Sequence, residues 1–390
     1  MQNCVGSPVR NEDFFPRPIE VEALWKAIKA GGHIFVAAPR RVGKTSILMK
    51  LLDDPHDGYA VVYISTESAD NENEFWQKLF HGLINQEFVG MVERYSKKIA
   101  ASLMGVIKNI KRIDATGVEF GDGVQHDHAA AFKELIKNLE IDKKIVIMID
   151  EFPQTVENII ECEGEKSARS FLKRNRELRH STWLGDKIVF IYTGSIGLES
   201  IATKLGGVKF INDLNRIQVM PLTMQDADQF IGLLMAGQSL VINGDIKKYL
   251  IEKIEWLIPF YIQLIVQEIS TLCKQQKIER ITSTEIIDKA ILESLNHKNH
   301  FEHWHQRLKC SFDTTAYKYA KEILTIISLK KTIDSASMAD LAVKYGIPED
   351  GKEIIHSLVY DGYINNNDIV QTYRFNSPIL RMWWEKNVAN

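Results

Sequence analysis

Short runs of consecutive apolar residues divide the first half of the chain. Four of them, rich in Val and Ile, lie at 33–38, 60–65, 144–149 and 187–194. Continuous apolar runs of this length predict strands that are buried on both faces, as in a parallel sheet. Helical patterns separate the runs. We therefore expect an α/β domain, with a parallel sheet and helices on both of its faces, up to about Thr223.

The pattern changes to helical spacing after that point. Apolar residues recur every three or four positions in 224–296, which is typical of a small bundle of helices forming a lid. A polar, His-rich connector follows at 297–311. Residues 312–390 predict three helices and then a hairpin around the Asn-rich turn of "INNNDIVQTYRF". This order is typical of a winged helix-turn-helix, so three domains are expected, the first of them at 1–223.

One segment, 91–128, fits neither pattern. Its basic helical part, which runs to Arg112, and its Gly-rich end indicate an insertion or a long connection. A basic helix with apolar residues between its charges is more typical of a helix whose charged face is solvated and whose apolar residues pack inward. It is less typical of a helix lying on a membrane or on nucleic acid.

Composition and charge narrow the classes of function. The chain has 390 residues, of which 45% are hydrophobic and 25% are charged, as in an ordinary globular protein of two or three domains. No apolar run approaches the roughly 20 residues that cross a bilayer, and no leader pattern opens the chain, so a cytoplasmic location without membrane contact is expected. The net charge of -3 gives no general attraction to nucleic acid.

The stretch "FVAAPRRVGKTS" resembles a phosphate-binding loop with one departure from its consensus, G-x-x-x-x-G-K-[ST]. Ala38 stands at the first Gly, and a negative φ there would make the substitution tolerable. A strand precedes the loop, and a helix follows it whose N-terminal dipole would face the phosphates. The candidate nucleotide-binding residues are Ala38, Pro39, Arg40, Arg41, Val42, Gly43, Lys44, Thr45 and Ser46.

Individual loop residues have separate expected roles. Lys44 is expected on the β- and γ-phosphates, and the hydroxyl of Thr45 on Mg²⁺. For Arg40 and Arg41 two interpretations stay open. They either reach a phosphate or a neighbouring subunit, or they are solvated like most loop arginines.

A pair of acids follows the third apolar run, in "KIVIMIDEF". Asp150 is suited to the Mg²⁺ shell, and Glu151 to orienting or deprotonating the attacking water. The alternative is a helix cap or a surface pair. Because the loop alone implies binding, it is this pair that predicts hydrolysis.

Hydroxyl and guanidinium groups near the fourth run are candidate γ-phosphate sensors. Thr193 and Ser195 end that strand, where a hydroxyl can meet the phosphate or simply close a turn. Arg176 and Arg179 lie on the preceding helix. Either can stabilise transition-state charge, from the same chain or from a second subunit, or can be an ordinary surface residue.

Taken together, "EDFFPRPIEVEALW", "APRRVGKTS", "IMIDEFP", "YTGSIG", "NDLNRIQVMPLT" and "IPFYIQ" resemble the archaeal-type P-loop ATPases, of the STAND branch of the AAA+-related ATPases. The resemblance covers nearly the whole chain and implies a C-terminal winged helix. It also implies that Phe15 and Arg17 rim the adenine pocket together with Pro259. Pro16 and Leu257 depart from the family pattern, which has Gly at both positions.

The resemblance and the motifs imply ATP or ADP and Mg²⁺ as cofactors, and a slow ATPase that acts as a nucleotide-driven switch through its lid and winged helix. Its partner would be an unknown protein, with a homo-oligomer on ATP binding as a further expectation. The alternative is a DNA-binding AAA+-like ATPase of initiator or transposition-helper type. Residues 312–390 hold nine Lys or Arg and ten Asp or Glu, a net charge of -1, which favours the protein partner.

Overall fold

The computed structural model describes residues 1–86, 110–114, 117–120, 127–139, 141–184, 187–194 and 197–389. The chain divides into two compact units. The sheet unit consists of Pro16–Ala38 and Ile47–Val219. The helical unit consists of Met1–Phe15, Pro39–Ser46 and Met220–Asn390, so it contains most of the candidate phosphate-binding loop as well as the lid and winged-helix regions. The division into three domains stays a prediction.

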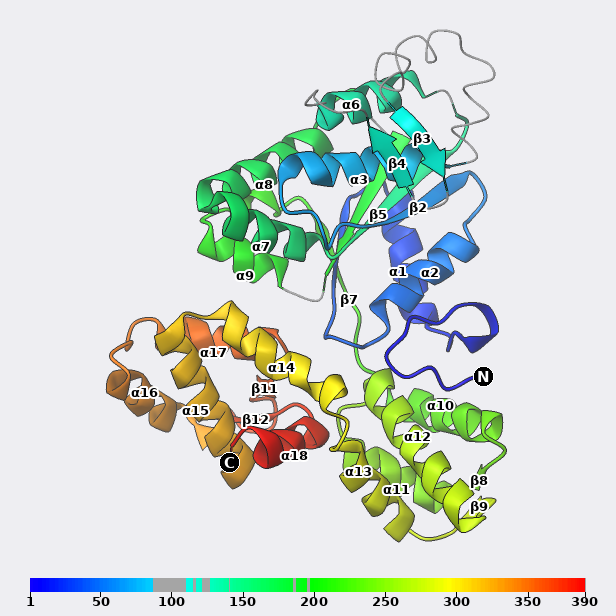
Figure 1. The fold of residues 1–390 in the computed structure, drawn as a ribbon, viewed down its shortest axis with the longest axis vertical. Helices are drawn as coiled ribbons and strands as arrows, with labels where there is room; N and C mark the ends of the chain where they lie inside the picture. The colour runs from blue at the N-terminus through cyan, green and yellow to red at the C-terminus, as the bar shows by residue number, and fades with distance from the viewer. Residues whose placement is uncertain are drawn as a thin grey trace. The chain divides into compact units, whose positions relative to one another are not determined.

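The sheet unit is built on a five-stranded parallel sheet with the order β2-β5-β6-β1-β7 (Figure 1). Its strands are β1 (Ile34–Ala37), β2 (Tyr59–Ser65), β5 (Lys144–Asp150), β6 (Ile188–Thr193) and β7 (Asn215–Gln218). The predicted α/β class and the four predicted strands are confirmed. The strand β7 was not predicted, because its sequence NRIQ is polar and mostly exposed.

Helices cover both faces of this sheet (Figure 1). Alternate strand residues such as Ile145, Ile147 and Ile149 form one apolar core with α3, α6, α7, α8 and α9, and α1 packs on β1 and β7 at the other face. The helices are α1 (Pro18–Lys29), α2 (Lys44–Asp53), α3 (Glu72–Ile84), α6 (His128–Asn138), α7 (Phe152–Glu163), α8 (Glu165–Arg179), α9 (Leu198–Lys204) and the 3-10 helix η3 (Val208–Phe210).

A small antiparallel ribbon occupies part of the segment 91–128. It pairs β3 (Ile110–Asp114) with β4 (Gly117–Phe120). The predicted basic helix is therefore wrong at 110–112, because the β-branched residues Ile110 and Ile113 favour a strand. Residues 91–109 of the predicted helix lie outside the described residues.

The lid region of the helical unit consists of four helices and a short parallel ladder. The N-terminal part of the same unit contains the 3-10 helix η1 (Asn11–Asp13). The helices are α10 (Met224–Gly237), α11 (Gly244–Ile254), α12 (Pro259–Gln276) and α13 (Glu285–Ser294), and the ladder pairs β8 (Val241–Ile242) with β9 (Arg280–Ile281). The stretch expected as a connector is mostly a helix, α14 (Lys298–Ser311), because Phe301, Trp304 and Leu308 bury one face.

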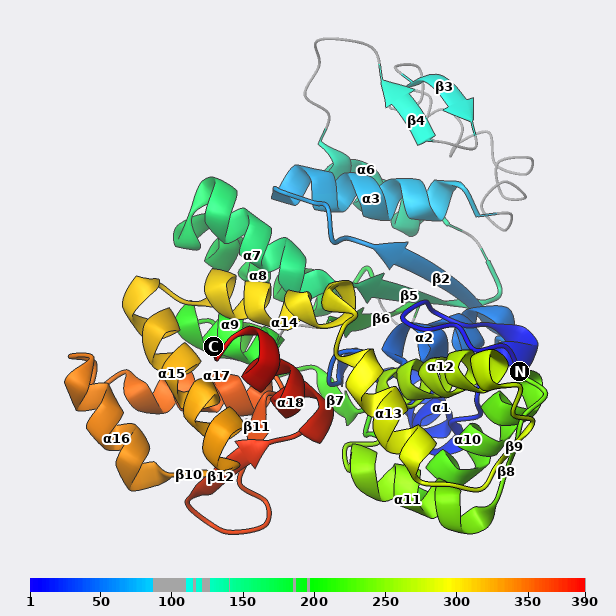
Figure 2. The same ribbon diagram turned by 60° about the horizontal axis from the view of Figure 1, so that its bottom comes forward.

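The C-terminal region has the predicted order of three helices and a hairpin, and it ends in a fourth helix that was not predicted (Figure 2). Its elements are α15 (Thr314–Lys330), β10 (Ile333–Asp334), α16 (Ser335–Lys344), α17 (Gly351–Tyr360), β11 (Ile364–Asn365), β12 (Thr372–Phe375) and α18 (Pro378–Asn387). The strand β10 was not predicted, and it pairs antiparallel with β12. Trp383 and Trp384 lie in the core of the helical unit, as expected for terminal aromatics of this kind.

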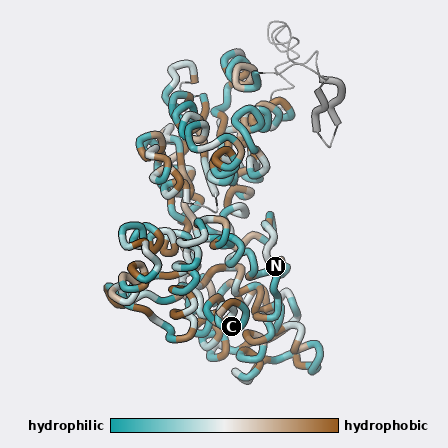
Figure 3. Tube along the Cα trace, turned by 60° about the vertical axis from the view of Figure 1, so that its left-hand side comes forward, coloured by the Kyte–Doolittle hydropathy of each residue, from teal (hydrophilic) through white to brown (hydrophobic). Residues whose placement is uncertain are grey.

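Hydrophobic and hydrophilic positions alternate along the helices (Figure 3), as amphipathic helices packed on a core require. No helix in the described part of the chain combines the length and the apolar character that a bilayer span needs.

Candidate functional site

The candidate loop leaves the carboxyl end of β1 and enters α2 at Lys44. Positive φ angles occur at Arg41 (64°) and Gly43 (94°) but not at Ala38. Ala38 is therefore tolerable at the first consensus position, as the sequence analysis requires, whereas Gly43 needs its glycine. Alternating signs of φ along a turn are typical of the backbone nests that bind anions.

The loop arginines interact with other parts of the helical unit, Arg41 by contact and Arg40 through its charge. The Arg41 guanidinium lies 4.4 Å from the ring centroid of Phe260, at the start of α12, and burial lowers the pKa of Arg41. Arg40 is close enough to Asp361, after α17, to oppose the rise that burial causes in the pKa of that carboxyl. The contact of Arg41 and the half-buried side chains of both arginines argue against the interpretation of both residues as simply solvated.

A buried ion pair and a neutral histidine lie beside these arginines. Arg307 of α14 donates a hydrogen bond of 2.7 Å to Asp361. Burial, followed by the charges of Arg41 and Arg40, lowers the pKa of His303 to about 3. His303 is consequently uncharged at neutral pH.

The residues that the family resemblance assigns to adenine fall in both units. In the helical unit, Phe15 packs on Phe230 of α10 with ring centroids 5.1 Å apart, and Pro259 is the first residue of α12. In the sheet unit, Arg17 precedes α1 and forms an ion pair with Glu20.

Asp150 ends β5 and is held by donors from both neighbouring strands. The Tyr63 hydroxyl on β2 donates to Oδ2 at 2.8 Å, and the Thr193 hydroxyl on β6 donates to Oδ1 at 2.6 Å. The Glu151 amide donates to Oδ1 at 3.1 Å. The hydroxyl of Thr193, expected near a γ-phosphate, therefore contacts the carboxylate instead, and Ser195 lies outside the described residues.

Glu151 has a left-handed backbone, with φ of 57° and ψ of 33°, directly before α7. A network of threonines fixes this turn. The amide and the hydroxyl of Thr66 both donate to the Asp150 carbonyl, at 3.0 and 3.1 Å, and the Thr155 hydroxyl donates to the Thr66 carbonyl at 2.7 Å. Thr66 and Thr155 are fully buried, so their hydrogen bonds resist exchange with water.

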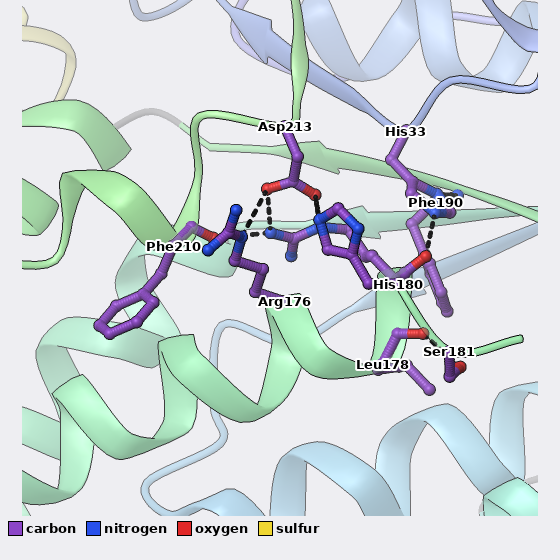
Figure 4. Close-up of polar contacts among 9 residues, drawn as sticks. His33, Arg176, Leu178, His180, Ser181, Phe190, Phe210 and Asp213 are labelled. Carbon is purple, nitrogen blue, oxygen red and sulfur yellow. Dashed lines mark hydrogen bonds and ion pairs between the residues drawn. The ribbon is translucent and has the colours of Figure 1, made fainter.

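The predicted sensor Arg179 is committed to a buried ion pair. Its guanidinium donates to both carboxylate oxygens of Asp213, at 2.7 and 2.8 Å, and to the Phe210 carbonyl at 2.6 Å. Burial alone would raise the pKa of Asp213, but the hydrogen bond and charge of Arg179 hold it below its ordinary value. Figure 4 shows Asp213 directed toward this group from the segment before β7.

Three further polar groups surround the pair (Figure 4). Arg176 lies 4.0 Å from Asp213 and its side chain is 36% exposed, and His180 lies 3.6 Å from Asp213. His33 Nδ1 accepts a hydrogen bond from the Phe190 amide, so its Nε2 is left to donate to the Arg179 carbonyl at 3.3 Å. Burial lowers the pKa of His33 to about 4, which keeps this tautomer neutral.

Ala38, Asp150 and Thr193 follow or end strands of one parallel sheet, so they share its carboxyl edge. His33 and Asp213 precede β1 and β7 and mark the opposite end of those strands. Sequence reasoning missed Tyr63 and Asp213. The phenol of Tyr63, within the otherwise apolar run "AVVYI", was the available signal.

No family model and no curated protein matches the chain. Solved structures do. The Walker-type ATPase PABY2304 of Pyrococcus abyssi superposes with a TM-score of 0.65 at 15% sequence identity, over 98% of this chain and 99% of that one. The ORC2 protein of Aeropyrum pernix, in ADPNP-ADP complexes, gives a TM-score of 0.56 at 11% identity, over 96% of each chain. The chain therefore has the fold of the archaeal Walker-type P-loop ATPases, as its motifs predicted.

Proposed function

We propose that the chain binds ATP and hydrolyses it slowly with Mg²⁺, as a switch acting through its lid and winged helix. Lys44 and the loop amides would hold the phosphates, and Thr45 and Asp150 the metal ion. Bound Mg²⁺ supplies a positive charge that offsets the charge developing on the transferred phosphoryl group. Positive φ at Gly43 and the oriented carboxylate of Asp150 suit this nucleotide and metal.

The switch is carried by one observation, the contact of the loop residue Arg41 with Phe260 of the lid region. The charge of Arg40 also opposes the rise that burial causes in the pKa of Asp361 in the winged-helix region. A ligand shifts a conformational equilibrium only through contacts that differ between two states. Because both arginines belong to the loop, a change of the loop on nucleotide binding alters these interactions directly.

The backbone of Glu151 supports its role in hydrolysis. A left-handed conformation at a residue with a side chain costs about 1 kcal/mol, and it persists where surrounding structure enforces it. Here the Thr66 and Thr155 hydrogen bonds fix the preceding turn. Such strain clusters at active sites, so we assign activation of the water to Glu151.

The two candidate arginines differ in how strongly neighbouring residues bind their guanidinium groups. Arg179 is engaged by Asp213 and the Phe210 carbonyl, which favours a structural role. Within one chain Arg176 lies beside Asp213, away from the carboxyl edge of the sheet. We therefore propose Arg176 of a second subunit as the γ-phosphate sensor beside Ser195. Phe15, Arg17 and Pro259 remain the proposed adenine contacts.

Charge and exposure on the winged helix favour a protein partner. Arg374, the basic residue of the wing, is bonded to Asp368 and to Glu255 at 2.9 Å. In the same wing Ile369 and Val370 are 64% and 82% exposed. The DNA-binding alternative rests on the exposed pair Lys330 and Lys331, and duplex binding that falls steeply with salt would support it.

Hydrogen exchange of α12 tests the switch. We expect exchange with a non-hydrolysable ATP analogue to exceed exchange with ADP by about tenfold in α12, which carries the Phe260 contact of Arg41, the change that about 1.4 kcal/mol of differential contact produces. Arg41→Met should reduce the difference, whereas Arg280→Met, an exposed arginine of the lid region, should not. Equal exchange in both nucleotides, with both bound, would contradict the switch.

A further inference from the structure

The carboxylate of Asp150 is clamped between hydroxyls from the strands on each side of β5. Tyr63 on β2 binds Oδ2, while Thr193 on β6 binds Oδ1 together with the Glu151 amide. Thr193 belongs to a segment that the sequence already marks as a candidate sensor. Tyr63 belongs to no motif.

The register of the sheet explains how Tyr63 reaches this carboxylate. Tyr63 pairs with Met148, and Ser65 pairs with Asp150, so Tyr63 and Asp150 are offset by two residues on adjacent strands. Residues with a two-residue offset lie on one face of the sheet, about 7 Å apart, within reach of an aromatic side chain that leans along its strand. A phenol spans this offset and ends on Oδ2, whereas a shorter hydroxyl would not.

The Tyr63 phenol donates this hydrogen bond as a neutral group, since an ordinary phenol stays protonated up to a pH of about 10. Because the donor is neutral, it orients the carboxylate without cancelling its charge.

We propose that Tyr63 is a positioning residue for Mg²⁺, which holds the Asp150 carboxylate in the orientation that receives the metal ion of the bound nucleotide. This inference rests on the proposed function. Tyr63 then contributes to the gain in nucleotide affinity that Mg²⁺ gives, and it does not contribute to the affinity for nucleotide without Mg²⁺. Outer partners of metal-binding groups typically change metal affinity by 10- to 100-fold when removed.

The test compares Tyr63→Phe, which removes a single oxygen, with Tyr59→Phe. Tyr59 lies on the same strand, at its other end, and its ring packs on Trp25. The affinity for a fluorescent mant-labelled, non-hydrolysable ATP analogue is titrated in Mg²⁺ and again in EDTA. We expect the gain in affinity that Mg²⁺ gives the wild type to fall about tenfold in Tyr63→Phe, with affinity in EDTA unchanged, and Tyr59→Phe to match the wild type.

The outcomes separate this inference from the proposed function. An unchanged Mg²⁺ effect in Tyr63→Phe overturns the positioning role, and so does an equal loss in Mg²⁺ and EDTA, which marks Tyr63 as structural. A wild type that does not bind the analogue, or that binds no better than Lys44→Ala, contradicts the proposed function instead.

Discussion

The sheet unit holds two carboxylates with different kinds of donor. Two hydroxyls and an amide of this unit, which are neutral groups, donate hydrogen bonds to Asp150. Asp213 receives a bidentate guanidinium from Arg179, with His180 3.6 Å away. Neutral donors fix the direction of a carboxylate and keep its charge, whereas a guanidinium compensates that charge. The difference separates a group suited to receiving a cation from a group that holds elements together.

The two carboxylates also differ in where their segments meet the sheet. Asp150 ends β5 at the carboxyl edge of the sheet, and the loop follows β1 at the same edge. Asp213 precedes β7 and binds the last residue of α8, beside His33 before β1. Function and stability are thus assigned to different ends of strands, and substitutions should affect them separately.

The largest expected effect is on turnover in Asp150→Asn. An amide of the same shape lacks the charge that Mg²⁺ needs, and loss of metal-assisted charge stabilisation costs several kcal/mol, or about 10³-fold in ATP turnover. Steady-state phosphate release measures it. The stability of the sheet unit should change by less than about 1 kcal/mol, since the amide oxygen still accepts from Thr193 and Glu151 and its NH₂ group can donate to the Tyr63 hydroxyl oxygen. Turnover close to that of the wild type would remove the contrast with Asp213.

The reverse effect is expected in Asp213→Asn. It leaves Arg179 buried without its counter-charge, which costs about 3 kcal/mol of stability. Hydrogen exchange of β1 and β6 amides measures the loss. The double variant Arg179→Met with Asp213→Leu should recover most of it, because both charges are then absent. A double variant as unstable as the single one would argue against charge compensation.

A smaller effect, of about 2 kcal/mol, should appear on acidification. The folded pKa of His33 is lowered from 6.5 to about 4, so below pH 6.5 the unfolded chain takes up a proton that the folded chain refuses. Stability is therefore lost as pH falls from 6.5 toward 4. Exchange of the β6 amides at pH 7.5 and 5.0 checks this. His33→Asn keeps an acceptor for the Phe190 amide but cannot titrate, and should lose less stability over the same range.

Arg176→Met should have the smallest effect on stability, below about 1 kcal/mol, because Arg176 is partly exposed and lies at the distance limit of an ion pair with Asp213. The same exchange measurement compares it with Arg179→Met. Loss of stability equal to that in Arg179→Met would mean that both arginines hold Asp213, and would leave the γ-phosphate sensor unassigned.

The sequence predicted the elements whose signal is local. Apolar runs identified β1, β2, β5 and β6, and helical spacing identified the lid helices and α15, α16 and α17, because burial on one or both faces imposes these patterns. The polar strands at the edges of the sheets were not predicted. The strand β7 reads NRIQ, and β10 is two residues long, so neither carries an apolar run. Both form because a neighbouring strand supplies their hydrogen bonds, which is a tertiary effect.

The candidate site shows the same division. Motif spacing identifies Lys44, Thr45, Asp150 and Glu151 as candidates, since the chemistry of each depends on near neighbours in sequence. The partners that orient or engage them come from distant segments. Tyr63 is 87 residues from Asp150, and Phe260 meets Arg41 only through the packing of α12. The sequence marks no such pair, because register and helix packing decide which side chains meet.

ATP turnover by the purified chain, beside Lys44→Ala and Glu151→Gln and with or without duplex DNA, tests the central proposal most directly. The account predicts slow, Mg²⁺-dependent turnover that is indifferent to DNA, lost in Lys44→Ala and reduced by about 10²- to 10⁴-fold in Glu151→Gln, the contribution expected of a general base. Turnover that survives both substitutions unchanged would contradict it.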